Sequence, residues 1–100
     1  MTKKSITPVI FRKFPEGDII AMFPTIPGTM NPNTCNSYQH LGQHGSATID
    51  LIHYTKPATE QEYKDLLEEI VSIGYDDLKI YQKNQYWMTQ ERIKELNRTR

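Results

Sequence analysis

Two hydrophobic runs separated by a turn sequence form the N-terminal part of the chain. Residues 8–14 and residues 19–23 are rich in β-branched and aromatic side chains, and Pro15-Glu16-Gly17-Asp18 lies between them. Proline presets φ and glycine permits a positive φ, so this pattern predicts a β-hairpin. Because side chains alternate across a strand, one buried face would carry Val9, Phe11, Ile19, Ala21 and Phe23.

The middle of the chain is less regular. Pro24 is expected to end the second strand, and the proline- and glycine-containing residues 25–36 predict a loop. Residues 37–41 would form a short extended segment. From Ser46 to Ile52 apolar and polar residues alternate, which predicts a half-buried antiparallel strand. Its buried side would carry Ala47, Ile49 and Leu51.

The clearest helix signal begins at Thr59. Thr59 and Glu62 have the spacing of a capping box, in which each side chain bonds the backbone amide of the other residue. Gly74 predicts the end of this helix, because glycine adopts the left-handed conformation common just past a C-cap. Between them an apolar stripe recurs at three- and four-residue steps, at Tyr63, Leu66, Leu67, Ile70 and Ile73.

The remaining pattern predicts one strand and a short second helix. Residues 78–81 read as a final strand, and residues 82–100 follow as a C-terminal extension. Thr89 would cap a helix over Gln90–Asn97, with Tyr86 and Trp87 anchoring the extension to the body.

The element order β-β-(β)-β-α-β predicts a single α+β domain over residues 8–81. A small, mostly antiparallel sheet of three to four strands would pack on one main α-helix. One helix covers only one face of a sheet. We therefore expect the other face to be open to water or to a partner.

Charge and cysteine usage narrow the function classes. Twelve basic and twelve acidic residues cancel, which argues against a protein that holds nucleic acid mainly through charge. One cysteine excludes an internal disulfide, and no apolar run reaches the length of a membrane span or a signal peptide. A reduced, cytoplasmic setting is therefore expected. The basic residues nearest the ends are Lys3, Lys4, Arg12, Lys13, Arg92, Lys94, Arg98 and Arg100.

The segment Cys35–Gly45 concentrates side chains that can ligate, donate or accept. The candidate functional residues in it are Cys35, Tyr38, His40, Gln43 and His44. A thiolate and imidazoles suit zinc, but only His53 is left as a fourth ligand and Gly42 separates the two histidines. No cofactor is predicted, and zinc at Cys35, His40, His44 and His53 is kept as the alternative.

Two further interpretations compete for the same segment. Cys35 would be a nucleophile with His40 or His44 as its base, although no third catalytic group is readable. Alternatively the segment would be a hydrogen-bonded connection that carries a recognition surface, with Cys35 as a small buried side chain.

Four stretches together resemble a family of small proteins without an assigned activity, encoded on phages, plasmids and conjugative or integrative elements of Bacteroidales and other bacteria. They are Phe23-Pro24, the pattern Cys35-x-Ser37-Tyr38-x-His40-x-Gly42-Gln43-His44-Gly45-x-Ala47, the pattern Thr55-Lys56-Pro57-Ala58-Thr59-x-x-Glu62-Tyr63, and Ile73-Gly74-Tyr75-Asp76-Asp77-Leu78. The resemblance covers residues 9–81. It implies an accessory protein of a mobile genetic element and no particular catalytic residue.

Three functional hypotheses follow. The first is a non-enzymatic accessory protein that binds a protein partner through the open sheet face or the Cys35–Gly45 segment. The second is a small metal-dependent or thiol enzyme, which requires Cys35 and the histidines to converge. The third is a nucleic-acid-binding protein, which requires the terminal basic residues to gather on one surface with exposed tyrosine or tryptophan.

Overall fold

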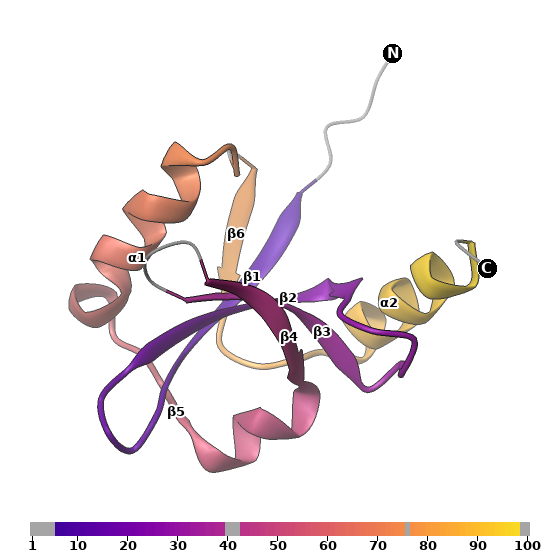
Figure 1. Cartoon of the computed structure of the whole chain (residues 1–100), viewed down its shortest axis with the longest axis horizontal. Helices are drawn as coiled ribbons and strands as arrows, with labels where there is room; N and C mark the ends of the chain where they lie inside the picture. The colour runs from indigo at the N-terminus through magenta and orange to yellow at the C-terminus, as the bar shows by residue number, and fades with distance from the viewer. Residues whose placement is uncertain (1–5, 40–42, 76, 99–100) are drawn as a thin grey trace.

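In the computed structural model, which describes residues 6–39, 43–75 and 77–98, the chain folds into an α+β domain. A sheet lies at the centre, with α1 at the left and α2 at the right in Figure 1. The elements are β1 (Thr7–Lys13), β2 (Ile19–Pro27), β3 (Thr34–Gln39), β4 (Gln43–Thr48), the 3₁₀ helix η1 (Ile49–Tyr54), β5 (Lys56–Pro57), α1 (Glu60–Ser72), β6 (Leu78–Tyr81) and α2 (Tyr86–Arg98).

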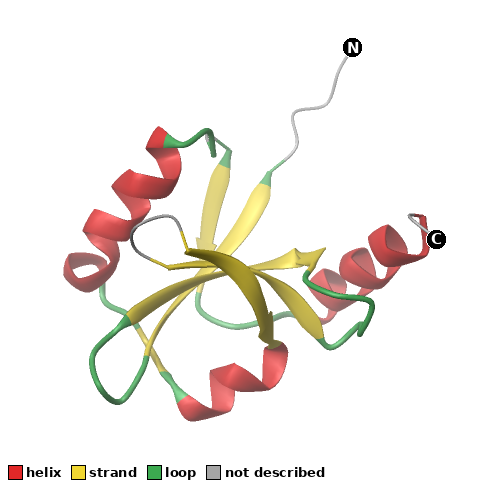
Figure 2. Ribbon diagram, in the orientation of Figure 1, coloured by secondary structure: helices red, strands yellow, loops and turns green. Residues whose placement is uncertain are grey.

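The six described strands form one sheet in the order β4-β3-β2-β1-β5, with β6 also paired to β1. Every pairing is antiparallel except that of β6 with β1, which is parallel. The predicted fold class is therefore confirmed, with more strands than the three to four expected. Figure 2 shows the strands between the helices.

The predicted hairpin is present, but its second strand does not end at Pro24. The Phe14 amide donates to the Asp18 carbonyl at 2.8 Å across the turn, and Gly17 adopts a φ of 107° there. β2 then continues through Pro24, because a register irregularity between Phe23 and Pro27 interrupts the ladder. Proline lacks an amide hydrogen and is tolerated in strands at such irregularities.

The strand predicted over residues 46–52 is only partly correct. β4 ends at Thr48, and η1 follows. The Ile49 amide donates to the Asn33 carbonyl at 2.8 Å, which continues the β3–β4 register by one position at the start of η1. The apolar side chains of η1 pack over the sheet. Ile49 and Ile52, three positions apart, share a side of this 3₁₀ helix, so the alternation does not mark a strand beyond Thr48.

α1 covers one face of the sheet, which we call the α1 face. Its capping box is formed as predicted by Thr59 and Glu62, and Gly74 has a φ of 124° just past its end. The core between α1 and the sheet contains Val9, Phe11, Ala21, Phe23, Tyr38, Leu66 and Ile70. Two ring pairs stack in it, Phe11 on Tyr63 at 4.4 Å and Phe23 on Tyr75 at 4.8 Å between centroids.

The opposite face, which we call the η1 face, is covered rather than open. Its core residues are Ile10, Ile20, Met22, Cys35 and Ala47, packed against Phe14, Ile49, Leu51, Ile52 and Tyr81. The expectation of an open sheet face is therefore wrong. A strand over residues 46–52 leaves the sheet without a second covering layer, whereas the residues of η1 supply that layer.

α2 begins at Tyr86, earlier than the predicted Gln90, and packs against β2. Thr89 does not cap it, and its hydroxyl instead accepts from the Asn84 side chain at 2.9 Å. Arg92 is 1% exposed, and its guanidinium donates to the carbonyls of Pro24 and Pro32 at 2.7 and 2.8 Å. The predicted contact of Trp87 with the body is made with Tyr81.

Arg12 is the second buried arginine, on the η1 face of β1. Its guanidinium donates to the carbonyls of Ile52, Thr55 and Gln82 and to the Thr55 hydroxyl, at 2.6 to 3.1 Å. Burial lowers the pKa of Arg12. Its hydrogen bonds tie the end of η1 and the segment after β6 to β1.

Candidate functional site: the β4 edge of the sheet

Cys35 lies in β3 on the η1 face and is completely buried. Burial raises the pKa of its thiol to about 11, and the nearby Arg92 opposes that shift only in part. The thiolate, rather than the thiol, is the nucleophile and the metal ligand. The surroundings of Cys35 therefore favour the protonated thiol, as expected for a small core side chain.

Tyr38 and His44 face the other side of the sheet. They are partners in the β3–β4 ladder, and their rings meet edge to face with centroids 4.7 Å apart. The Tyr38 hydroxyl donates to the carboxylate of Glu69 in α1. Cys35, which pairs with Ala47, points to the opposite face, so the sheet itself separates the thiol from the imidazole of His44.

His53 is exposed in η1, beside a hollow lined by Phe14, Tyr54 and Lys56. Cys35, His44 and His53 therefore occupy three different places. Among the described residues no group of three or more His, Cys, Asp or Glu side chains could hold a metal ion. His40 lies outside the described residues, and of Gln43 only the backbone, in β4, is described.

The third hypothesis required the terminal basic residues on one exposed surface. Arg12 and Arg92 are 5% and 1% exposed, so neither guanidinium is available to a phosphate backbone. Lys13 is paired with Glu62. Exposed aromatic side chains do occur at Tyr54, Tyr86 and Trp87.

β4 is an edge strand of the sheet. In the part of the chain that the structure describes, β4 pairs with β3 on one side and with no strand on the other. His44, Gly45, Ser46 and Thr48 are exposed, whereas Ala47 is buried. The exposed part of the predicted segment is therefore its C-terminal end, where it enters β4.

The hydrogen-bond alternation of antiparallel strands determines which backbone groups of β4 point outward. The Phe14 amide bonds to Asp18 in the β2 direction, whereas the Phe11 carbonyl accepts from the Ala58 amide just beyond β5. The backbone amides and carbonyls of the even-numbered β1 residues therefore point towards β2. When this alternation is followed through the strand registers, the outward-facing amides and carbonyls of β4 are those of His44, Ser46 and Thr48.

The side chains of β4 leave this edge unprotected. Natural sheets discourage pairing at an edge with lysine, proline, a bulge or a very short strand. β4 has the sequence Gln-His-Gly-Ser-Ala-Thr over Gln43–Thr48, without lysine or proline. It is in continuous register with β3 over all six residues.

Two hollows flank the edge, one on each face of the sheet. The α1-side hollow is lined by Tyr38, His44, Ile73, Gly74 and Tyr75. The η1-side hollow has apolar side chains from Phe14, Ile20, Ala47 and Leu51, with Ser37, Gln39 and Thr48 among its polar residues. A strand added to β4 would direct successive side chains alternately towards the two hollows.

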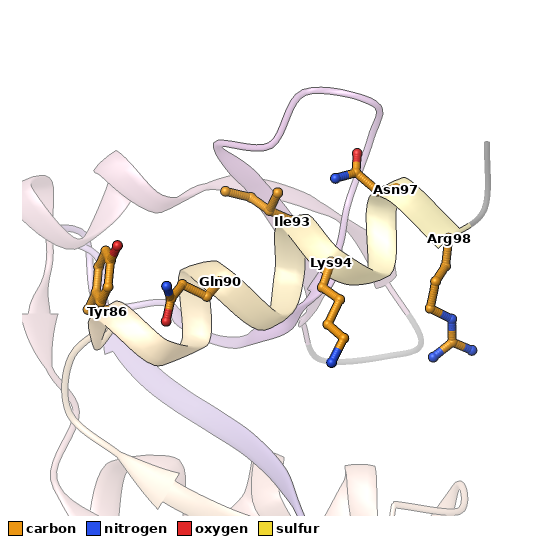
Figure 3. Close-up of a pocket in the computed structure, with 6 residues that line it drawn as sticks. All are labelled: Tyr86, Gln90, Ile93, Lys94, Asn97 and Arg98. Atoms are coloured by element: carbon orange, nitrogen blue, oxygen red, sulfur yellow. The ribbon is translucent and has the colours of Figure 1, made fainter.

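A further hollow on α2 differs from these two. Figure 3 shows that the residues lining it all come from one helix, so no second element forms an opposite wall. They are Tyr86, Gln90, Ile93, Lys94, Asn97 and Arg98. This surface is a partly apolar stripe on the outward side of α2.

The segment predicted from the sequence forms β3 and β4 over its described residues, but the sequence interpretation missed Glu69, Tyr75 and the edge position of β4. A signal for the separation of Cys35 from His44 was available. A hairpin that pairs Gln39 with Gln43 also pairs Tyr38 with His44 and Cys35 with Ala47. That register alone places Cys35 and His44 on opposite faces.

No helix among the described residues is both long and apolar enough to cross a membrane. Comparisons with protein-family models, with curated proteins and with solved structures found no match to this chain.

Proposed function

We propose that this chain is a non-enzymatic accessory protein of a mobile genetic element that binds an extended segment of a protein partner at the β4 edge. The observation that carries the proposal is an exposed, regular and unprotected edge strand with a hollow on each side. In β-strand addition, main-chain hydrogen bonds supply affinity and pockets for alternate side chains supply specificity. β4 offers both the outward-pointing backbone groups and the flanking hollows that this mode of binding uses.

The geometry of the outward backbone groups supports this mode of binding. His44, Ser46 and Thr48 are at alternate positions, so a partner strand would meet a regular ladder. The strand is also held firmly from behind, because β3 and β2 belong to both cores. A rigid edge limits the ordering cost on this side of the complex.

The mobile-element part of the proposal is supported by the sequence resemblance. The stretch in which the resemblance is densest, Cys35 to Ala47, forms β3 and β4 over its described residues. The residues shared with the family thus include the pair of strands that ends at the free edge. The buried thiol in this stretch is consistent with a structural rather than a chemical role for Cys35.

Site-specific photo-crosslinking in cells tests the proposal. Benzoylphenylalanine replaces Ser46 on the β4 edge in one variant and Lys79 on the opposite edge in a matched variant. We expect a crosslinked protein from the Ser46 position and none from the Lys79 position, with the crosslink in an extended segment of a partner encoded on the same element. That segment, made as a peptide, should shift the backbone amide resonances of β4.

Equal crosslinking from both positions contradicts binding at the β4 edge. A partner that crosslinks at Ser46 but whose peptide leaves the β4 amides unshifted contradicts strand addition. A partner encoded elsewhere in the host contradicts the mobile-element role and leaves the edge as the binding site.

A further inference from the structure

We infer that the segment added at β4 carries a lysine or arginine on the α1 side and an apolar side chain on the η1 side. The inference rests on the proposed function and names the chemistry of its ligand. It is carried by the difference between the two hollows that flank the edge.

The α1-side hollow suits a cation. Tyr38, His44 and Tyr75 line it. Tyr38 is 2% exposed and one face of Tyr75 stacks on Phe23, so an ammonium or guanidinium group would meet the other face of Tyr75. Glu69 does not line the hollow, but its carboxylate accepts a hydrogen bond from Tyr38, which does. The partner's cation would lie near this carboxylate.

The end of α1 adds to the negative potential. The C-terminus of a helix carries a partial negative charge, which basic side chains commonly offset. The last turn of α1 has no basic residue, and it contains Glu69. Gly74, just past this end, lines the hollow itself. A cation from a bound strand would lie beside this end of the helix.

The η1-side hollow suits an apolar group instead. Phe14, Ile20 and Leu51 contribute apolar side chains. Of the β4 residues whose side chains are described, Gly45 and Ala47 lie on this face, and both are small. No aspartate, glutamate, lysine or arginine lines this hollow, although His44 does. An aliphatic side chain of a bound strand would bury apolar surface here.

The alternation of a strand converts these preferences into a pattern. Neighbouring residues point to opposite faces, so the cationic and apolar residues are adjacent or have an even number of residues between them. β4 itself, Gln43–Thr48, contains His44 but no lysine, no arginine and no large apolar residue. Pairing of β4 with the β4 of a second copy would therefore leave the η1-side hollow unfilled, so the occupant is a segment of a different strand.

Short peptides measure the preference directly. The probe is an end-capped peptide in which arginine and valine alternate. Three matched peptides replace arginine by citrulline, replace arginine by glutamate, or keep the composition but group the arginines at one end. We expect the alternating peptide to shift the amides of β4 and to bind about tenfold tighter than the citrulline peptide, as a difference of one decade in Kd. The glutamate and grouped peptides should bind more weakly still.

Two protein variants locate the charge effect. Glu69→Gln keeps an acceptor for the Tyr38 hydroxyl but removes the carboxylate charge. Glu68→Gln removes the same charge from the neighbouring, exposed position of α1. We expect Glu69→Gln to reduce the advantage of arginine over citrulline and Glu68→Gln to leave it nearly unchanged. An equal loss in both variants would show diffuse attraction to an acidic helix and would overturn the inference.

The outcomes separate this inference from the proposed function. If the citrulline or glutamate peptide shifts the β4 amides with the same Kd as the arginine peptide, the edge binds strands but the cationic preference is wrong. If no peptide shifts β4, the inference is also wrong, and the crosslinking experiment then decides independently whether the edge binds any segment.

Discussion

The two edges of the sheet are built differently. β4 forms one edge with six residues in unbroken register. The other edge is shared by β5 and β6, which have two and four residues and both pair with β1. The short strands also carry Lys56, Pro57 and Lys79, which are residues that discourage pairing at an edge. Only the β4 edge lacks these protective features.

The difference extends to what lies behind each edge. Arg12 ties the segments before β5 and after β6 to β1 through hydrogen bonds to three backbone carbonyls. The β5–β6 side is therefore held by polar contacts directed inward. Beside β4 two hollows are accessible instead. One edge is closed by both composition and hydrogen bonding, and the other is available to a partner.

The largest effect is expected from breaking the closed edge at Arg12. Arg12→Ala removes the donors for the carbonyls of Ile52, Thr55 and Gln82, and it leaves a cavity on the η1 face. We expect a loss of about 3 kcal/mol in the free energy of unfolding, as for breaking a buried charged network. Urea unfolding followed by circular dichroism measures it.

The neighbouring Lys13 supplies the control. Its ammonium is paired with Glu62 at the surface, and exposed pairs contribute at most about 1 kcal/mol. Lys13→Ala should therefore change stability much less than Arg12→Ala. Comparable losses from the two substitutions would show that the buried hydrogen bonds of Arg12 are replaced by water.

The next effect concerns the support of the open edge at Gly28. A Cβ atom added to Gly28 would lie 2.5 Å from the Cys35 carbonyl oxygen and 2.6 Å from Cβ of Ser46. Both neighbours belong to the β3–β4 pair and cannot move without shifting that pair. Gly28→Ala should therefore cost about 2 kcal/mol, as for an overpacked site, measured by the same unfolding experiment.

Gly45 in β4 offers a matched alanine substitution. A Cβ atom there would meet only the Ser37 hydroxyl, at an ordinary 3.6 Å. Gly45→Ala should remain within about 0.5 kcal/mol of the wild type. A large loss at Gly45, or none at Gly28, would contradict the packing described at this edge.

Local signals made part of this fold predictable from the sequence. The turn at Gly17, the capping box of Thr59 and Glu62, and the end of α1 at Gly74 each depend on a few neighbouring residues. All three are confirmed. In each case the residues that carry the signal also make the contact, so no knowledge of the tertiary fold is required.

The features that were missed depend on contacts between distant residues. η1 begins at Ile49 and packs its apolar side chains over the sheet, a contact that the local alternation of residues 46–52 does not reveal. α2 starts at Tyr86, although Thr89 has the better local cap signal. The helix is held by the burial of Met88, Arg92 and Leu96, and it packs against β2. The third hypothesis requires Arg12 and Arg92 on an exposed surface, yet both are buried and bonded to carbonyl groups that only the fold brings near. The presence of an arginine in the sequence does not indicate whether the fold will bring such partners to it.

The candidate site shows the same limit. The segment was identifiable because it concentrates Cys35, Tyr38 and His44. Its interpretation depended on strand register, which separates Cys35 from His44 across the sheet. The hollow beside Tyr38 also needs Glu69 and Tyr75, which lie far along the chain.

Exchanging the residues at Ser46 and Lys79 tests the difference between the two sheet edges. The expected effect on stability is smaller than at Gly28. Ser46→Lys places on β4 the kind of residue that guards β6, and Lys79→Ser removes it from β6. Both positions are exposed, so each variant should stay within about 0.5 kcal/mol of the wild type. Binding of the arginine–valine peptide should be lost in Ser46→Lys and retained in Lys79→Ser. Retention of binding by both variants would argue against strand addition at β4.

The smallest effect is a pH dependence at Glu62, where α1 meets the closed edge. The hydrogen bond from Lys13 and that from the Thr59 amide lower the pKa of Glu62 below its ordinary value of 4.5. A lowered carboxyl pKa means that the folded state favours the ionised form. The resulting stabilisation is present above the unfolded-state pKa and is lost as the pH falls through the folded-state value.

The melting temperature of wild type should thus exceed that of Glu62→Gln at neutral pH, and the gap should close on acidification below pH 4.5. High salt at neutral pH should narrow the same gap, because both side chains of the Lys13–Glu62 pair are accessible to solvent. A gap that stays constant from neutral to acidic pH would show that the difference between glutamate and glutamine at position 62 does not come from the carboxylate charge.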